Sequence, residues 1–171
     1  RDGGVIRRLF LKSKKMAEEI EHKFLVTGEA WRALGTPVRY RQGYLATGPD
    51  CIVRVRIKGT QARLTVKGRP HGIVRPEYEY PIPVSDAEEL LDMVGADRQI
   101  IKNRTKIPFK GKIWEVDEFF GKNKGLVVAE IELKSVNEPF EKPDWVGEDI
   151  SEDVRYYNLS LMQHPYSQWK S

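Results

Sequence analysis

Several short stretches of this 171-residue chain carry charged side chains at alternate positions, and nearly all of those charges are Lys, Arg, Glu or Asp. Successive side chains of a β-strand point to opposite faces, so each stretch predicts a strand with one charged face and one apolar face. Some stretches are acidic and others are basic, and few contain the Ser, Thr, Gln or Asn of an ordinary solvated face. The stretches are residues 19–23, 54–56, 63–67, 77–79, 102–104, 115–117 and 130–132.

The acidic and basic stretches favour complementary ligands. Two carboxylates at positions i and i+2 share one face of a strand, roughly 7 Å apart along it, and such oxygen ligands suit hard divalent cations. Arg binds phosphate through two parallel hydrogen bonds, and Lys binds it as a compact charge. The sequence contains no Walker-type phosphate loop, so side chains would have to hold the phosphates. The charges therefore indicate a site for a highly charged anion and a divalent metal ion.

The composition excludes several classes of protein. With 40% hydrophobic and 32% charged residues, it is typical of a soluble globular protein. No apolar run reaches the ~18 residues that a transmembrane helix needs, so we expect a cytoplasmic protein with no membrane partner. The single Cys51 fits a reducing compartment, and one Cys with three His argues against a zinc site.

The formal charge of +4 is concentrated at the N-terminus. Residues 1–15 contain six basic residues and one acidic residue; removing these from the 29 Lys+Arg and 25 Asp+Glu of the chain leaves 23 and 24, a net charge of −1. The basic balance therefore gives no support for a nucleic-acid partner. We expect residues 1–15 to be a dispensable basic extension and residues 16–171 to form a single domain, whose pairing as a homodimer stays open.

The alternation predicts eight strands separated by Gly and Pro turn signals. A short helix is expected over residues 29–34, with Gly35 as its stop, and a second over residues 85–93 that starts with an S-x-x-E capping box at Ser85. A third is expected over residues 151–161. The predicted strands are residues 19–26, 38–46, 52–58, 62–67, 75–80, 99–107, 112–119 and 126–133.

The predicted fold class is mainly β, as an eight-stranded antiparallel barrel with a few short helices. Closure hides both the strand edges and one face of every strand. Periodicity alone leaves two arrangements open, and it favours the first. The charged faces point outward to water around an apolar core, as in an ordinary small barrel, or they point inward to a lumen while helices and loops cover the apolar faces.

The segment EEIEHKFLV, residues 18–26, resembles the N-terminal ExExK signature of the CYTH superfamily, the triphosphate tunnel metalloenzymes. The resemblance is closest to short bacterial inorganic triphosphatases, and it implies a closed eight-stranded tunnel with the charges inside. It continues in chain order through RQGYL (41–45), RVRIKG (54–59), LTVKG (64–68), RPEYEY (75–80), KNR (102–104), WEVDEF (114–119), AEIEL (129–133) and EDVRYYN (152–158).

The resemblance also implies roles for individual residues. The residues that match the triphosphate-binding cations are Lys23, Arg54, Arg56, Lys67, Lys102 and Arg104. The residues that match metal ligands are Glu19, Glu21, Asp117, Glu130 and Glu132. The residues expected to be catalytic are Glu19, Glu21, Lys23, Glu130 and Glu132. Tyr44, Arg155 and Tyr156 fall in matching segments without an assigned role.

The reaction implied by the resemblance is hydrolysis of inorganic triphosphate to pyrophosphate and phosphate with Mg²⁺ or Mn²⁺. Other activities stay open: a class IV adenylate cyclase, a thiamine triphosphatase and a module that only binds polyphosphate. A cyclase needs an adenine and ribose pocket, which no motif specifies, and a binding module does not need acidic pairs. Glu77 and Glu79 fit a charge-balancing role as well as a site role, and Arg63, Lys106 and Glu115 are expected at strand ends in water.

Replacing Glu130 or Glu132 by Gln keeps the shape of the side chain but removes a charged oxygen. If these residues hold a catalytic metal ion, as the resemblance implies, the loss raises the barrier by several kcal/mol and slows tripolyphosphate hydrolysis roughly a hundredfold or more. Steady-state phosphate release with added Mg²⁺ or Mn²⁺ measures the effect. Undiminished turnover by both variants, or by the unaltered protein in excess EDTA, would contradict the mechanism.

Overall fold

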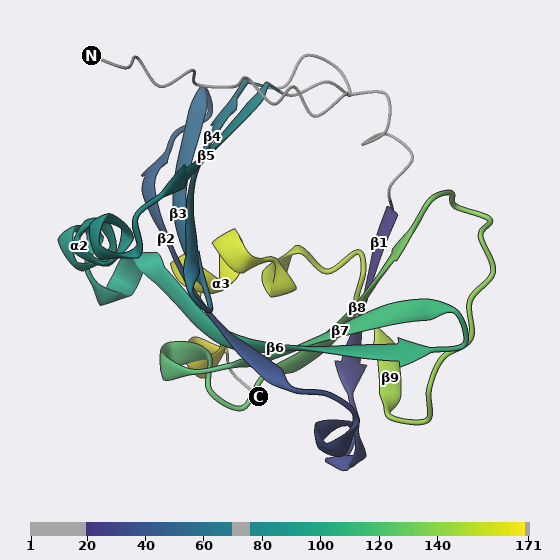
Figure 1. The fold of residues 1–171 in the computed structure, drawn as a ribbon. Coiled ribbons are helices and arrows are strands. Elements are labelled where there is room, and N and C mark those ends of the chain that lie inside the picture. The colour runs from purple at the N-terminus through teal and green to yellow at the C-terminus, as the bar shows by residue number, and fades with distance from the viewer. Residues whose placement is uncertain (1–19, 70–75, 170–171) are drawn as a thin grey trace. The chain divides into compact units, whose positions relative to one another are not determined.

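The computed structural model describes residues 20–69 and 76–169 (Figure 1). The described residues form two compact units: unit 1 lies within Gln42–Gln99, and unit 2 combines residues 20–41 with residues 100–169. The expected extension over residues 1–15 lies outside the described residues, as does Glu19. In the two described ranges, no helix is long and apolar enough to cross a membrane.

The described residues are mainly β, with antiparallel strand pairs and short helices, so the coarse fold class is confirmed. The strands are β1 (Ile20–Val26), β2 (Pro37–Thr47), β3 (Cys51–Lys58), β4 (Gln61–Gly68), β5 (Glu77–Ile82), β6 (Gln99–Phe109), β7 (Lys112–Phe119), β8 (Val127–Leu133) and β9 (Val146–Asp149). The α-helices are α2 (Val84–Val94) and α3 (Asn158–Gln163). Short 3₁₀ turns are η1 (Ala30–Leu34), η2 (Ala96–Arg98), η3 (Gly121–Asn123), η4 (Val154–Tyr156) and η5 (Tyr166–Gln168).

The expected closure into an eight-stranded barrel is wrong. The hydrogen-bonding order of the described strands is β5-β4-β3-β2-β6-β7-β8-β1-β9, an open nine-stranded sheet that ends at β5 and β9. β9 pairs with β1 at Phe24 and Val26, and the N–H of Ile150 then donates to the carbonyl of Lys23, so this edge of β1 is already occupied. Sequence patterning missed β9 because four residues are too few to show an alternation.

Two local predictions fail at helix ends. The first hydrogen bond of α2 runs from the N–H of Ala87 to the carbonyl of Pro83 (3.1 Å), so Ser85 lies inside the first turn and forms no cap. The segment over residues 29–34 is a 3₁₀ turn, and Gly35 after it has an extended backbone (φ −169°) instead of the left-handed one expected at a helix stop.

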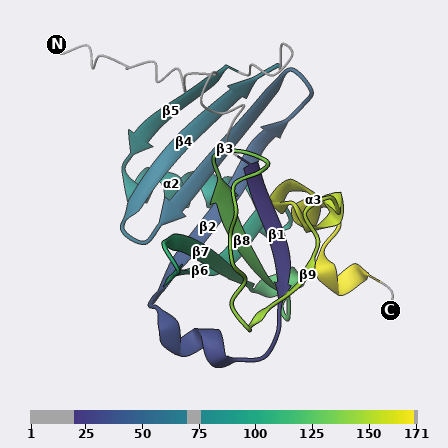
Figure 2. The ribbon, with the colours of Figure 1, turned by 90° about the vertical axis from the view of Figure 1, so that its right-hand side faces the viewer.

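In unit 1, α2 covers one face of the strands (Figures 1 and 2). Ala87 and Leu91 of α2 form a buried cluster with Val55 of β3 and Ala62 of β4. Because side chains alternate along a strand, the residues between these apolar positions point to the opposite face. The charged residues of β3, β4 and β5 therefore share the face of unit 1 that α2 leaves uncovered.

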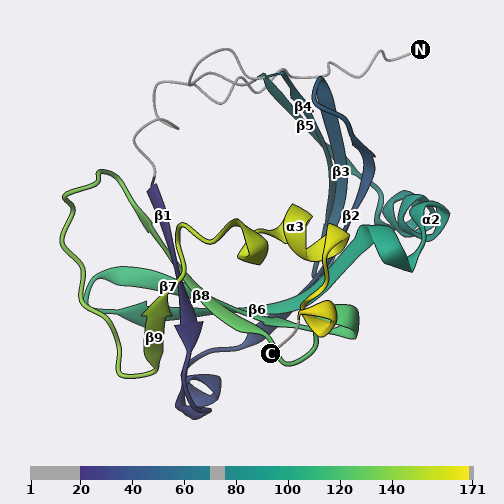
Figure 3. The ribbon, with the colours of Figure 1, turned by 180° about the vertical axis from the view of Figure 1, so that it is seen from behind.

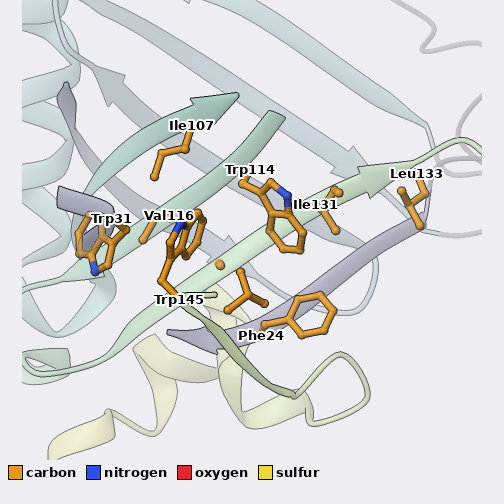
Figure 4. Close-up of a cluster of buried hydrophobic side chains, with 10 residues drawn as sticks. Phe24, Trp31, Ile107, Trp114, Val116, Ile131, Leu133 and Trp145 are labelled. Atoms are coloured by element: carbon orange, nitrogen blue, oxygen red, sulfur yellow. The ribbon is translucent and has the colours of Figure 1, made fainter. Parts of the chain in front are cut away.

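In unit 2, an aromatic core covers the apolar face of the strands (Figure 4). The Trp114 side chain has 0% exposed surface, and its ring centroid lies 5.6 Å from that of Phe24 and 6.1 Å from that of Trp145. Trp31 of η1 and Ile131 of β8 belong to the same cluster. Turns and loops thus cover the apolar strand faces of unit 2. This covering is the one expected for charged faces that line a lumen.

Gly35 follows η1, the turn between β1 and β2 (Figure 3), and it is needed for close approach instead of backbone freedom. A Cβ atom there would lie 2.7 Å from the carbonyl oxygen of Lys106 and 2.7 Å from Cγ2 of Thr105, both on β6. Gly35→Ala should therefore reduce the free energy of unfolding by about 1–3 kcal/mol, measured by urea denaturation. Gly48→Ala is the control, because its nearest contact is an ordinary 3.9 Å, and equal stability of the two variants would contradict the close approach.

Candidate functional site

Four adjacent strands of unit 2, β6, β7, β8 and β1, share a charged face. In their register, Lys23 is opposite Glu130, Glu130 is opposite Glu115, and Asp117 is opposite Arg104. Directly opposite residues of antiparallel strands have Cβ atoms about 4.5–5.5 Å apart, so these charged groups can reach one another. A slip of one residue would move all of them to the apolar face, so the aromatic core fixes the site.

Asp117 lies at the centre of this charged face. Its side chain is 0% exposed, and it accepts hydrogen bonds from Nζ of Lys102 (2.7 Å), Nε of Arg104 (2.7 Å) and Nη2 of Arg104 (2.8 Å). Burial by itself raises the pKa of Asp117, but the charge of Lys102 and the hydrogen bonds of Arg104 outweigh it, so the pKa lies below its ordinary value of 3.8. The carboxylate is therefore ionised at neutral pH.

The two cations around Asp117 differ in their surroundings. The side chain of Lys102 is 1% exposed. This burial lowers the pKa of Lys102 and outweighs the charge of Asp117, which by itself raises it. The side chain of Arg104 is 15% exposed; burial lowers its pKa, but the hydrogen bonds and charge of Asp117 raise it further, so Arg104 stays charged. Both cations lie near the ring of Tyr40, with Lys102 Nζ 5.7 Å from its centroid.

Glu130 connects Arg104 to Lys23. One of its oxygens accepts from Nζ of Lys23 (2.6 Å) and the other from Nη2 of Arg104 (3.2 Å). The ammonium group of Lys23 also lies 2.9 Å from Glu21. Burial alone lowers the pKa of Lys23, but the charges of Glu130 and Glu21 outweigh burial and raise it. Opposite charges therefore alternate without a break from Glu21 to Lys102.

Glu21 and Glu132 fit a hard cation better than the other acids of this face. They are directly opposite each other on β1 and β8, where like charges destabilise a sheet, and both residues are exposed. A divalent cation beside them would relieve this repulsion. Among the described residues no group of three or more His, Cys, Asp or Glu side chains is placed so that it could hold a metal ion.

The charged face of unit 1 holds the other expected cations. Arg54 is opposite Thr65, and Lys67 is opposite Ile52 and Glu77, so these groups lie along β3 and β4 on the side away from α2. Nε of Arg56 donates to Oε1 of Gln42 (2.9 Å), which fixes the guanidinium. The remaining acid on this face, Glu79, lies 3.9 Å from Arg63, which fits a charge-balancing role.

A segment that the sequence left without a role reaches the lysines of unit 2. A pocket of about 250 Å³ beside Lys23 is lined by Glu21, Ser151, Tyr157 and Asn158. Oγ of Ser151 accepts from the N–H of Lys23 (2.9 Å), and Nζ of Lys23 lies 5.6 Å from the ring centroid of Tyr157. The sequence signal for these residues was weak, because Ser, Tyr and Asn in a segment without alternating charges do not by themselves indicate a binding site.

Glu115 and Arg155, to which the sequence assigned no site role, both form ion pairs. Glu115, expected in water, accepts from Nη1 of Arg104 (3.1 Å) with its side chain 25% exposed. Its position two residues before Asp117 on the same strand was the sequence signal that the two carboxylates share one face. Arg155 pairs with Asp153 and stacks on Trp169 (4.7 Å to the ring centroid), so its contacts are local to the C-terminal segment.

The chain belongs to the CYTH domain family, whose model matches residues 17–166. It is 49% identical over 155 residues to an inorganic triphosphatase of Acetivibrio thermocellus, covering 91% of this chain and 99% of that protein. It is 38% identical over 148 residues to an inorganic triphosphatase of Nitrosomonas europaea, covering 84% of this chain and 95% of that protein. The crystal structure of the inorganic triphosphatase NE1496 matches with a TM-score of 0.67 and 35% identity, covering 84% of this chain and 93% of that one.

Asp117→Asn should destabilise the protein by about 3–5 kcal/mol at neutral pH, because the buried Lys102 and the half-buried Arg104 lose their charged partner. The pKa of Asp117 is lower in the folded chain than in the unfolded chain, so its contribution to stability is present above about pH 3.8 and is lost as the pH falls through the folded value. Urea denaturation at several pH values should show the difference between the two proteins narrowing below about pH 4. Glu118→Gln on the same strand is the control, because its partner Arg32 is exposed and such pairs contribute about 0–1 kcal/mol.

Proposed function

We propose that this chain is a metal-dependent enzyme that hydrolyses inorganic triphosphate to pyrophosphate and phosphate. The observation that carries the proposal is the alternation of opposite charges on the face of unit 2, where Lys23, Arg104 and Lys102 are interleaved with Glu130 and Asp117. Such an arrangement offers cations to a polyanion and carboxylates to a metal ion within one surface. The two relatives named inorganic triphosphatase support the same activity.

The cations of unit 2 neutralise the substrate. Lys23, Lys102 and Arg104 have side chains between 1% and 15% exposed, so their charges act in a region with little water and are stronger there than in bulk solvent. In the reaction a water oxygen bonds to the terminal phosphorus and the phosphoric anhydride bond breaks, so negative charge builds up on the leaving pyrophosphate. The cations stabilise that charge. No covalent nucleophile is needed.

Arg54, Arg56 and Lys67 of unit 1 are proposed to bind phosphate oxygens of a triphosphate. The support is the face that they share on β3 and β4, together with their resemblance to the triphosphate-binding cations of the CYTH superfamily. Gln42 holds Arg56 through Nε, which orients the guanidinium for a ligand that accepts two hydrogen bonds.

Glu21 and Glu132, together with Glu19 and Glu130, are proposed to hold Mg²⁺ or Mn²⁺. An ion of this kind, when bound, would act as a Lewis acid and offset the negative charge of the leaving group. The ammonium group of Lys23 lies within 2.9 Å of both Glu21 and Glu130. It therefore holds the two carboxylates near each other and reduces the repulsion between them.

Inorganic triphosphate is the preferred substrate in this proposal. The pocket beside Lys23 contains the ammonium group of that lysine, the hydroxyls of Ser151 and Tyr157 and the amide of Asn158. These groups can donate hydrogen bonds to phosphate oxygens, and only the ring of Tyr157 offers an apolar surface to a nucleoside. A cytoplasmic location and a homodimeric state remain predictions from the sequence.

The test offers the purified protein tripolyphosphate, ATP and thiamine triphosphate with Mg²⁺ or Mn²⁺. We expect the highest kcat/KM for tripolyphosphate, with phosphate and pyrophosphate in equal amounts, and no turnover in excess EDTA. Lys102→Gln should lower kcat/KM at least tenfold, because a charge beside the substrate is lost. Lys106→Gln on the same strand is the matched control, since Lys106 is exposed.

Two results would change the assignment. Faster turnover of ATP with release of cyclic AMP would replace the triphosphatase by a cyclase. A higher kcat/KM for thiamine triphosphate would replace the inorganic substrate by that ester.

A further inference from the structure

Three acids contact Arg104, and they differ in how firmly they hold it. Asp117 accepts from Nε and Nη2 at 2.7 and 2.8 Å and is 0% exposed. Glu115 accepts from Nη1 at 3.1 Å and Glu130 from Nη2 at 3.2 Å, and the side chain of Glu115 is 25% exposed. Asp117 therefore holds the inner edge of the guanidinium, while two weaker partners occupy the outer edge formed by Nη1 and Nη2.

The oxygens of Asp117 are both engaged by cations. Oδ1 accepts from Nε of Arg104, and Oδ2 accepts from Nη2 of Arg104 and Nζ of Lys102. A cation that approached this carboxylate would have to displace a guanidinium and an ammonium group in a fully buried position, and would meet their repulsion. The contacts of Asp117 thus differ from those of Glu21, whose side chain is 50% exposed.

We propose that Asp117 is a positioning residue that holds Lys102 and Arg104 for the triphosphate, and that it does not ligate the metal ion. This rests on the proposed function. In the same proposal, phosphate oxygens replace Glu115 and Glu130 on the outer edge of Arg104, while the bonds to Asp117 persist. Substrate binding then frees one oxygen of Glu130 for the cation, so the anion and the metal ion bind in a coupled way.

The first experiment measures two affinities of Asp117→Asn separately. Tripolyphosphate binding is followed by calorimetry in EDTA, and Mn²⁺ binding by electron paramagnetic resonance without substrate. We expect the tripolyphosphate affinity to fall at least tenfold and the Mn²⁺ affinity to stay within twofold of the unaltered protein. Glu132→Gln should show the reverse order of effects, and Glu118→Gln, on the far side of the same strand, should change neither affinity.

Weaker Mn²⁺ binding by Asp117→Asn, or an unchanged tripolyphosphate affinity, overturns the proposal. Circular dichroism establishes that the variant is folded. If it is not, Lys102→Gln replaces it, because the Gln amide can still donate to Asp117. The positioning role predicts unchanged Mn²⁺ affinity in Lys102→Gln, whereas a metal-binding Asp117 that has lost an ammonium partner would bind Mn²⁺ more tightly.

The outcome is distinguishable from a failure of the proposed function. If the protein binds tripolyphosphate without hydrolysing it, the triphosphatase activity is wrong, but the two affinities still decide the role of Asp117. If tripolyphosphate does not bind the unaltered protein, both proposals fail.

Discussion

The buried carboxylate of Asp117 between two cations is the interaction on which the charged face of unit 2 depends. Lys102 has almost no exposed surface, and a lysine so placed is stable as a cation only with an ionised partner in contact. Arg104 connects this pair to further charges, because its Nη atoms also donate to Glu115 and Glu130. Glu130 in turn accepts a hydrogen bond from Lys23. Each charge is offset by its neighbours, so a dense group of ionised side chains can exist on one sheet face without bulk water between them.

The apolar face of the same strands gives this arrangement its rigidity. Trp114 is the immediate neighbour of Glu115 in the chain, and Val116 lies between Glu115 and Asp117; both apolar side chains are fully buried. Packing around Trp114 and Phe24 therefore fixes the strand register, and the register fixes which charges meet. In unit 1 the apolar face of the strands is covered by α2, and the cations lie on the opposite face.

In the proposed function, the charge pattern also accounts for the binding of a polyanion. Carboxylates occupy hydrogen-bond donors of Arg104 and Lys23, so these cations are held in place. A phosphate group can substitute for the more weakly held carboxylates, because both present two anionic oxygens that accept parallel hydrogen bonds from a guanidinium. Binding by exchange of partners leaves the total charge of the cluster close to balance, and each released carboxylate is a potential oxygen ligand for a divalent ion.

The sequence by itself predicted the charged and apolar faces of the strands and placed eight strands close to their observed bounds. Alternation is a local property, and strands such as β7, over Lys112–Phe119, were predicted with their observed bounds. The tertiary structure alone decided that the sheet is open with a ninth strand, that α2 begins at Val84 directly after Pro83, and that Gly35 is needed for close approach to β6. It also decided the partners of each charge: spacing grouped Asp117 with the acids expected to bind metal, whereas its contacts are the cations Lys102 and Arg104. Spacing along one strand cannot distinguish an acid that faces a cation from one that faces solvent, because that difference arises from the neighbouring strands.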